Sequence, residues 1–465
     1  MVIYMSTKKY SIAIDLGTTT VAAALIDKKD NKVISEKSFL NLQYPEFGLD
    51  SVKRIQNGLN IKSVKKLQGK ALLTIANLLN YFIKERGIDL TDIIETALAG
   101  NTAMELSFCG YPLADLSKPP YKPAFNIVFP EKINELKLAS GGGGGGIGVN
   151  LIGVNLIDVN LISSDSISPD NFNPGKNIGT LNSDLFIFPI LDGFVGGDTV
   201  SSIYYLDMHN KDNPVFIADF GTNVEIAIGN KNKIFTTSAP AGPAFEGGNI
   251  RRGMLAQGSA ISSIKLKNGI FDFETISGSK IPEGICGSGI IDLIASLLRE
   301  KIIDKNGRIL PMELIDSESY PVVNKGFNNE ENEVIVYRDN KTDIRFYQDD
   351  VRQFQFAKSA VKSAAEILIN KYKININDNF DVYISGSFGN YIKNENIDII
   401  DIFPFKNKKI NYIDDSSLQG CKKYLISECC IRKKDISKIM GISKNFPLSG
   451  SKLFERLFIK NLSWQ

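Results

Sequence analysis

Two stretches of this sequence place a carboxylate just before a turn of small and hydroxyl-bearing residues: "IDLGTTTV", with Asp15, and "ADFGTNVE", with Asp219. The turn residues are Gly17, Thr18, Thr19 and Thr20 in the first stretch and Gly221, Thr222 and Asn223 in the second. Because small residues leave the backbone accessible, their N–H groups can approach an anion closely, and the hydroxyls add further donors. The two turns therefore predict a site for a triphosphate, held between them.

The two carboxylates imply a metal ion. Asp15 and Asp219 would repel a polyphosphate unless a hard cation lay between them, and Mg²⁺, which usually keeps several water ligands, suits that position. We therefore expect both residues to contact Mg²⁺ through water, and we count both as catalytic. The alternative for each is an ordinary turn with an acid at the end of a strand.

A third glycine turn completes the predicted nucleotide site. "SGSFGN" follows an apolar strand, and Gly386, Phe388, Gly389 and Asn390 in it leave room for a flat aromatic ring against bare backbone, which suits adenine or its ribose. One such turn arises easily by chance. Two hydroxyl-bearing turns between apolar strands, with a third turn after the second copy, favour nucleotide binding.

Other polar residues have a functional and a structural interpretation. Asp198, after two glycines in "FVGGDTV", could orient or deprotonate an attacking water, but an acid is also favoured in the first turn of a helix. In "FEGGNIRRGM", Glu246 could bind the ribose and Arg251 or Arg252 the phosphates, unless the arginines are a solvated pair. Asn101 in "AGNTAM" is expected near the nucleotide or a partner surface, or as a helix cap.

The elements that must position these residues form a repeat. Apolar runs predict a strand, a tight turn and a second strand over 9–26, and the same order recurs over 215–228. The repeat predicts a duplicated α/β domain, with lobe I at 9–208 and lobe II at 214–465. Within lobe I, a glycine run and three copies of a five-residue repeat predict a surface loop over about 138–182.

The composition excludes several classes of protein. In 465 residues, 54 Lys and Arg face 52 Asp and Glu, so no positive excess indicates nucleic acid as a partner. No leader and no apolar run long enough for a bilayer are evident, which predicts a cytoplasmic protein without a membrane partner. The only histidine, His209, is expected in a surface turn. The cysteines lack the spacing of iron–sulfur clusters; they are Cys109, Cys286, Cys421, Cys429 and Cys430.

The three turns together resemble those of the acetate and sugar kinases, heat-shock ATPases and actin. In that superfamily two phosphate hairpins and an adenosine turn bind ATP and Mg²⁺. The resemblance implies an α/β fold, a duplicated ribonuclease-H-like (actin-like ATPase) domain with two lobes around a nucleotide cleft. It also implies two connecting helices with small residues, to which "FVGGDTVSSI" and "SSLQGCKKYL" are similar.

A closer resemblance is to the C-terminal ATPase domain of the reductive activators of corrinoid proteins, which use ATP to drive one-electron reduction of an inactive Co(II) corrinoid to Co(I). It implies ATP hydrolysis with lobe closure, and a corrinoid protein or related metalloprotein as client. The matching stretches, in chain order, are "NLQYPEFGLDSVKRI", "AGNTAM", "LDGFVGGDTV", "DFGTNVEIAIGN", "AGPAFEGGNIRRGM", "GICGSGIIDLI", "DVRQFQFAKSAV" and "SGSFGNYI".

The chain also departs from that family. Its members normally have an iron–sulfur domain, whereas this chain starts at the first phosphate strand and shows no cluster ligands. We therefore expect no iron–sulfur cluster in this chain and a separate ferredoxin-like electron donor; ATP-driven switching alone is the alternative. A small-molecule kinase of the same fold, with Asp198 as its base, and an actin-like polymer are competing functions. The client and the oligomeric state stay open.

Overall fold

The computed structural model divides into two compact units. Unit 1 comprises Met1–His209 and Ser416–Ser443, and unit 2 comprises Asn210–Asp415 and Lys444–Gln465. Each has its own hydrophobic core. The structure describes residues 9–48, 51–123, 183–267, 269–311, 314, 332–386 and 393–464, and the backbone alone of 136–140, 147–151 and 323–325.

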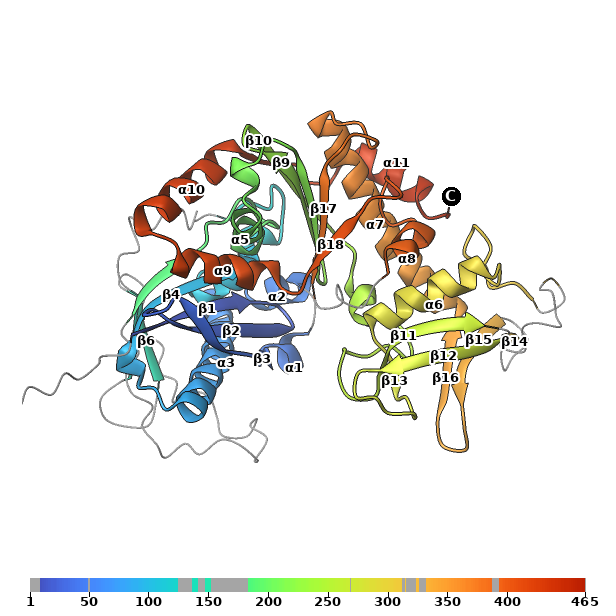
Figure 1. Cartoon of the computed structure of the whole chain (residues 1–465), viewed down its shortest axis with the longest axis horizontal. Coiled ribbons are helices and arrows are strands. Elements are labelled where there is room, and N and C mark those ends of the chain that lie inside the picture. The colour runs from blue at the N-terminus through green and yellow to red at the C-terminus, as the bar shows by residue number, and fades with distance from the viewer. Residues whose placement is uncertain are drawn as a thin grey trace, which may run out of the picture. The chain divides into compact units, whose positions relative to one another are not determined.

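Unit 1 is built on a five-stranded sheet with strand order β3-β2-β1-β4-β7 (Figure 1). The strands are β1 (Tyr10–Leu16), β2 (Thr20–Asp27), β3 (Lys32–Leu40), β4 (Ile93–Gly100) and β7 (Asp184–Ile187). β1 pairs antiparallel with β2 and parallel with β4, so the predicted first hairpin is confirmed.

Helices cover both faces of this sheet. Side chains alternate along a strand, so Ile14 of β1 enters the core with α3 (Ile61–Arg86), whereas Asp15 faces α9 (Ser416–Ile426). Asn60 begins α3 by accepting a hydrogen bond from the amide of Ser63, at 3.0 Å. The prediction from sequence placed 416–443 in lobe II, but α9 and α10 (Cys429–Ile442) pack within unit 1.

Unit 2 repeats the plan with a six-stranded sheet of order β18-β17-β8-β9-β10-β19. β8 and β9 form an antiparallel hairpin and β17 lies parallel to β8, as β4 does to β1. The strands are β8 (Val215–Phe220), β9 (Val224–Asn230), β10 (Lys233–Ala239), β17 (Asp381–Gly386), β18 (Ile410–Ile413) and β19 (Ser443–Asn445). The internal duplication expected from the sequence is confirmed.

Smaller sheets complete the described strands. Sheet β12-β11-β13 packs against α6. Among the described strands, β14-β15-β16 and β5-β6 form two more sheets, each with its own strand pairing. Their bounds are β5 (Leu136–Ser140), β6 (Ile147–Leu151), β11 (Ala260–Lys267), β12 (Ile270–Thr275), β13 (Gly284–Ile285), β14 (Val323–Lys325), β15 (Asn332–Arg338) and β16 (Asp343–Tyr347). Apart from the β5 and β6 backbone, the predicted loop at 138–182 lies outside the described residues.

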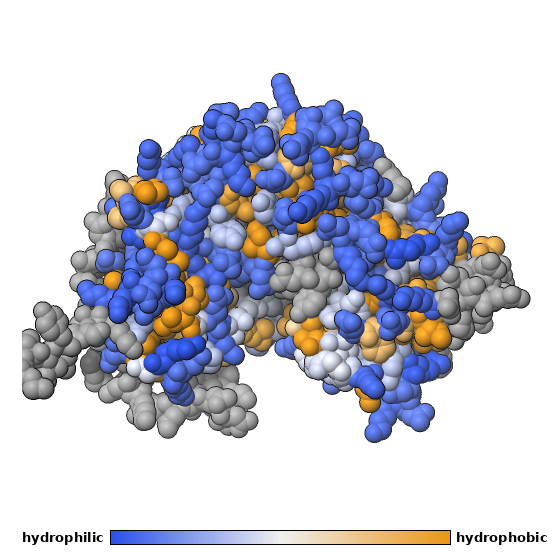
Figure 2. Space-filling model, viewed as in Figure 1, coloured by the Kyte–Doolittle hydropathy of each residue, from blue (hydrophilic) through white to orange (hydrophobic). Residues whose placement is uncertain are grey.

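Of the remaining helices in the described part of the chain, α7 is the longest. They are α1 (Tyr44–Phe47), α2 (Ser51–Asn57), α4 (Thr102–Phe108), α5 (Gly197–Tyr205), α6 (Gly287–Arg299), α7 (Gln348–Tyr372), α8 (Asn394–Ile400) and α11 (Lys452–Lys460). In the part of the chain described, no helix combines the length and apolarity needed to cross a membrane. On the face shown in Figure 2, hydrophilic residues predominate and apolar ones lie among them in small groups.

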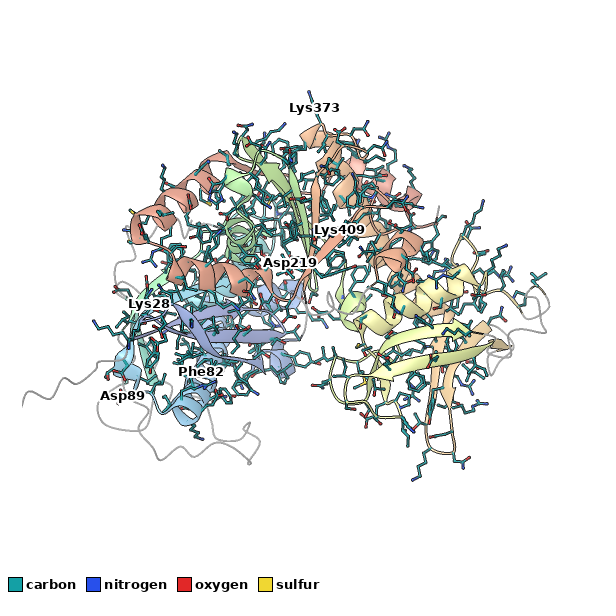
Figure 3. The ribbon with its side chains drawn as sticks, viewed as in Figure 1. Lys28, Phe82, Asp89, Asp219, Lys373 and Lys409 are labelled. Atoms are coloured by element: carbon teal, nitrogen blue, oxygen red, sulfur yellow. The ribbon has the colours of Figure 1, made fainter. Side chains whose placement is uncertain are left out.

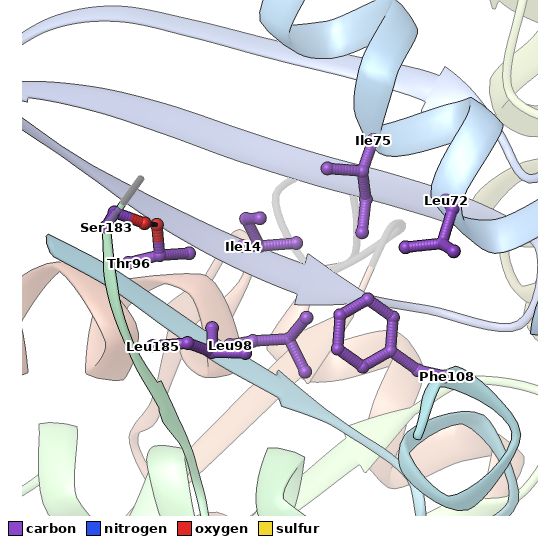
Figure 4. A pocket seen from close by; sticks show the side chains of 8 residues that line it. All are labelled: Ile14, Leu72, Ile75, Thr96, Leu98, Phe108, Ser183 and Leu185. Atoms are coloured by element: carbon purple, nitrogen blue, oxygen red, sulfur yellow. Dashed lines mark hydrogen bonds between the residues drawn. The ribbon is translucent and has the colours of Figure 1, made fainter. Parts of the chain in front are cut away.

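Unit 1 also contains a buried histidine and a small cavity. His209, expected in a surface turn, is fully buried beside Asp435 of α10, with Nε2 and Oδ1 3.4 Å apart, so that prediction was wrong. A cavity of about 10 Å³ lies between the sheet and α3, lined by Ile14, Leu72 and Leu98 among others (Figure 4). It is large enough for about one water molecule, so it is a packing defect and not a nucleotide site.

Candidate nucleotide site

The carbonyl groups in the turn of the first hairpin accept hydrogen bonds from Asn41 and Arg54, which lie on one side of the turn. Asn41 donates from its side-chain amide to the oxygen of Gly17, at 2.9 Å, and from its backbone to the oxygen of Thr19, at 2.8 Å. Arg54 donates to the oxygen of Thr18, at 3.0 Å. In a trans peptide the N–H points opposite to the C=O, so the amides of Thr18 and Thr19 face away from Asn41 and Arg54. The turn thus presents donors on its open side.

The hydroxyls of the turn differ in their surroundings. Thr18 Oγ1 accepts a hydrogen bond from Asn101 Nδ2, at 2.9 Å, and Asn101 Oδ1 accepts from the amide of Met104 at the start of α4. Asn101 therefore caps α4, one of the interpretations considered from the sequence, and its side-chain amide also contacts the turn of the first hairpin. Thr19 Oγ1 is buried and has no partner among the described residues. Thr20 is exposed at the start of β2.

Asp15 lies half-buried near the end of β1, as expected. Ser417 of α9 donates from Oγ to Asp15 Oδ1, at 2.6 Å. The bond fixes one carboxylate oxygen beside the hydroxyl-bearing turn. A carboxylate in this position suits the preference of Mg²⁺ for hard oxygen ligands.

Unit 1 has two further carboxyl groups in this region, Asp198 and Glu105, and the sequence indicated only Asp198; the charges of both Asp198 and Asp15 act on Glu105. Asp198 lies in the first turn of α5, and its Oδ1 accepts hydrogen bonds from the amide and the hydroxyl of Thr199, at 2.6 and 3.3 Å. Burial raises the pKa of Asp198 to about 6. Glu105 of α4 is fully buried and accepts from the amide of Gly100, at 3.0 Å. Burial, and then the charge of Asp198, raise the pKa of Glu105 well above its usual value.

The sequence analysis did not identify Glu105, because this residue lies outside the three glycine turns. Glu105 is the one acid in "TAMELSF", and all seven residues of this helix, α4, are buried. Buried acids without a cationic partner are rare, because burial disfavours their charge. An isolated Glu inside an apolar helix next to a candidate site is therefore the signal that could have found it.

The second hairpin, in unit 2, has Asp219 near the end of β8 (labelled in Figure 3). Its turn is closed by a hydrogen bond from the amide of Gly221 to the oxygen of Asn223, at 3.0 Å. Thr222 Oγ1 donates to Glu246 Oε2, at 3.4 Å. Unit 2 thus brings Glu246, predicted to bind the ribose, to the predicted phosphate turn.

The third turn begins at the same edge of the unit 2 sheet. Gly386 ends β17 opposite Phe220, the last residue of β8, and the two strands are parallel. At φ +117° a Cβ on Gly386 would lie 2.3 Å from the oxygen of Phe220, so this position requires glycine. Phe388, Gly389 and Asn390 lie outside the described residues.

The two arginines after "FEGGNI" have different environments. Arg251 is bound to Asp349, at 3.2 Å, and its guanidinium lies 4.3 Å from the centre of the Tyr347 ring. Arg252 is exposed, and the described residues offer its side chain no bonding partner. Of the pair, Arg252 is the one whose charge is available to a ligand.

The two predicted connecting helices, α5 and α9, cross within unit 1. Ser201 of α5 donates from Oγ to the oxygen of Ser417, at 2.7 Å, and Ser202 and Ser416 join through their hydroxyls, also at 2.7 Å. A Cβ on Gly420 would lie 2.1 Å from the oxygen of Ser201. Because Gly420 has no side chain, α9 can approach α5 this closely while holding Asp15.

The two units with their matching hairpin sheets have the actin-like ATPase fold, the fold class expected from the three turns. The family model for the C-terminal domain of RACo, the ASKHA domain, matches residues 213–465, and that for the RACo middle region matches 10–145. The chain therefore belongs to the RACo family. ASKHA denotes the acetate and sugar kinase, heat-shock ATPase and actin fold, so the predicted fold class is confirmed.

Individual relatives agree with this assignment. The chain is 30% identical to "Corrinoid activation enzyme RamQ" of Eubacterium limosum, covering 90% of this chain and 64% of the relative. It is 24% identical to the "[Co(II) methylated amine-specific corrinoid protein] reductase" of Methanosarcina barkeri, covering 61% and 52%. The solved structure of a "Reductive activator for corrinoid,iron-sulfur protein" superposes with a TM-score of 0.78 at 27% identity, covering 99% of this chain and 66% of that one. The chain thus spans about half to two thirds of these relatives.

Proposed function

We propose that this chain binds and hydrolyses ATP with Mg²⁺ and couples closure of its two lobes to the reactivation of a Co(II) corrinoid protein or a related metalloprotein. The main support is the first hairpin, where the carbonyls of Gly17, Thr18 and Thr19 all accept hydrogen bonds and the buried hydroxyl of Thr19 has no partner among the residues that the structure describes. Membership of the RACo family and the activities for which its relatives are named support the corrinoid client.

The residues of unit 1 have distinct roles in this proposal. The turn amides and Thr19 would bind phosphate oxygens, and Asp15 would hold Mg²⁺. A single carboxylate such as Asp15 fits an ion that keeps most of its water ligands, and the ion would supply charge neutralisation of the phosphates when bound. Asp198, with a pKa of about 6, is mostly ionised at neutral pH and can orient a water and accept its proton. Asp219, Thr222 and Glu246 bind the nucleotide from unit 2.

The coupling requires a difference in affinity. A client that binds the closed and open forms unequally is driven between two states by ATP turnover, since a ligand shifts an equilibrium only by its differential affinity. The electron that takes Co(II) to Co(I) comes from an external donor. A separate ferredoxin-like protein as that donor, and the cytoplasm as the location, stay predictions from the sequence.

One assay tests the proposal. ATP turnover is measured with and without a Co(II) corrinoid protein and a low-potential one-electron reductant, while the absorbance of the corrinoid reports Co(I). We expect turnover that the corrinoid protein stimulates and Co(I) that appears only with ATP. A phosphorylated small molecule as product would instead identify a kinase, and polymer detected by light scattering an actin-like filament; either result contradicts the proposal.

A further inference from the structure

Arg54 is a fully buried arginine directly behind the first hairpin. It lies on α2 with 1% of its surface exposed. Its guanidinium donates to the oxygen of Thr18, at 3.0 Å, to the oxygen of Gly48, at 2.9 Å, and to Oε1 of Gln43. All three acceptors are neutral.

This burial is costly without a compensating anion. Within the part of the chain described, no carboxylate forms an ion pair with Arg54, and burial alone lowers the pKa of its guanidinium to about 10. Arg54 therefore stays charged at neutral pH. Buried charges in proteins are normally paired, because neutral hydrogen-bond acceptors replace only part of the lost hydration. A neutral donor would serve if the only task were to hold the turn.

The orientation of the turn relates this charge to phosphate. Arg54 binds the C=O of Thr18, so the N–H of the same peptide group, that of Thr19, points to the opposite side. A cation bound to the carbonyl polarises the peptide and strengthens its N–H as a donor. The positive charge and the aligned peptide dipoles then act on an anion on the open side of the turn.

We propose that Arg54 is a positioning residue of the first phosphate hairpin, and that its buried charge selects for ligands with several phosphates. The inference rests on the proposed nucleotide binding and adds a residue and a selectivity to it. It also gives a physical role to part of the "NLQYPEFGLDSVKRI" stretch, which contains Asn41, Gln43, Gly48 and Arg54.

Two variants separate the charge from the hydrogen bonds. R54Q removes the charge and part of the donor set. Q43E instead keeps Arg54 and places a carboxylate against it, which neutralises the charge in place. Q43E also loses the bond from Gln43 Nε2 to the oxygen of Leu67, at 2.8 Å. Q68E is its matched control, because Gln68 is buried in α3 and donates in the same way to the oxygen of Phe108, at 2.7 Å.

The dissociation constants of Mg-ATP and AMP are measured by calorimetry for the full chain, together with thermal unfolding without nucleotide. We expect R54Q and Q43E to weaken Mg-ATP about tenfold or more while AMP changes about twofold or less, because the interaction scales with ligand charge. Q68E should leave the ratio of the two constants unchanged. If R54Q does not fold, Q43E alone decides.

The outcomes distinguish this inference from the proposed function. One outcome is that the wild-type chain binds Mg-ATP while Q43E and R54Q leave the ratio of the Mg-ATP and AMP dissociation constants unchanged. This result would show that Arg54 only supports the fold, and it would overturn the inference. An equal change of the ratio in Q68E would overturn it too. Wild-type chain that does not bind Mg-ATP would overturn the proposed function, and this inference with it.

Discussion

At the scale of single residues, Thr19 is the most direct indication of a ligand. A buried hydroxyl without a partner is unfavourable in the free protein, and replacing it with an apolar group of the same shape costs little. We expect T19V to leave the unfolding free energy of the nucleotide-free chain within about 0.5 kcal/mol of wild type and to weaken Mg-ATP about tenfold, the effect of one hydrogen bond to a charged group. Urea unfolding and calorimetry measure the two. A clear loss of stability without loss of affinity would show that the hydroxyl serves the fold.

Glu105 gives a prediction about pH. The pKa of Glu105 is higher in the folded chain than the usual 4.5 of the unfolded chain. Folding therefore favours the protonated carboxyl group. The stability that protonated Glu105 contributes is lost as pH rises above about 4.5 toward the pKa of the folded chain. In that window we expect the unfolding free energy to fall by up to about 1.4 kcal/mol per pH unit. E105Q keeps a neutral acceptor for Gly100 and should remove this slope.

Urea unfolding of E105Q at several pH values between about 5 and 8 tests this expectation. Asp198 contributes a slope of its own below about pH 6, and because its charge interacts with that of Glu105, E105Q and wild type are compared at the pH values above 6. E85Q, at an exposed position near the end of α3, is the matched control and should follow wild type. The same slope in E105Q and wild type would show that Glu105 is ionised in the folded chain.

The residues predicted from sequence are those whose chemistry is local. Asp15, Thr18 and Thr19 could be proposed as site residues because acid, glycine and hydroxyl residues stand next to one another in one turn. Arg54 and Glu105 could not, since the roles proposed for them depend on contacts with residues elsewhere in the chain: Arg54 with Thr18 across 36 positions, for example. Such contacts become visible only when the fold is known.

At the scale of elements, a substitution where α5 and α9 cross tests whether the packing of these helices holds Asp15 in place. Ala at position 420 would place a Cβ 2.1 Å from the oxygen of Ser201, so the helices must separate. We expect G420A to destabilise the chain by about 1–3 kcal/mol, the usual cost of overpacking, and to lower ATP turnover because Ser417 moves away from Asp15. Thermal unfolding and turnover are the measurements.

Gly441 provides the control for this substitution. It also lies in a helix, α10, but is exposed, and no atom lies within 4 Å of a Cβ built on it. G441A should therefore leave turnover unchanged and stabilise the chain by up to about 1 kcal/mol, the difference in helix propensity between alanine and glycine. Equal stability of G420A and wild type would show that α9 can shift without cost.

The elements themselves were largely predictable, whereas their grouping was not. Apolar runs located both hairpins, because strands buried in a sheet are rich in apolar residues. Periodicity holds no information on which sheet a helix packs against. For that reason α9 and α10 were assigned to lobe II, although their contacts lie in unit 1, and His209, covered by α10, was expected at the surface.

At the scale of the whole molecule, the central proposal is that the two hairpins act on one nucleotide. Asp15 belongs to unit 1 and Asp219 to unit 2, so a double-mutant cycle addresses the proposal in solution. We expect D15N and D219N each to lower ATP turnover on the order of 100-fold, as loss of a group that stabilises the reacting phosphate does. If both serve the same Mg-ATP, the double variant should lose much less than the product of the two effects, because residues acting as a unit are strongly non-additive.

The control for this cycle is D27N, at the opposite end of the first hairpin, where Asp27 accepts a hydrogen bond from the amide of Lys29, at 2.8 Å, and lies near Tyr10. D27N should keep wild-type turnover, and D27N with D219N should behave as D219N alone. Thermal unfolding excludes variants that lose turnover through loss of folded protein. Effects of D15N and D219N that multiply fully would mean that each carboxylate acts independently, so that the duplication would provide two separate sites instead of one shared site.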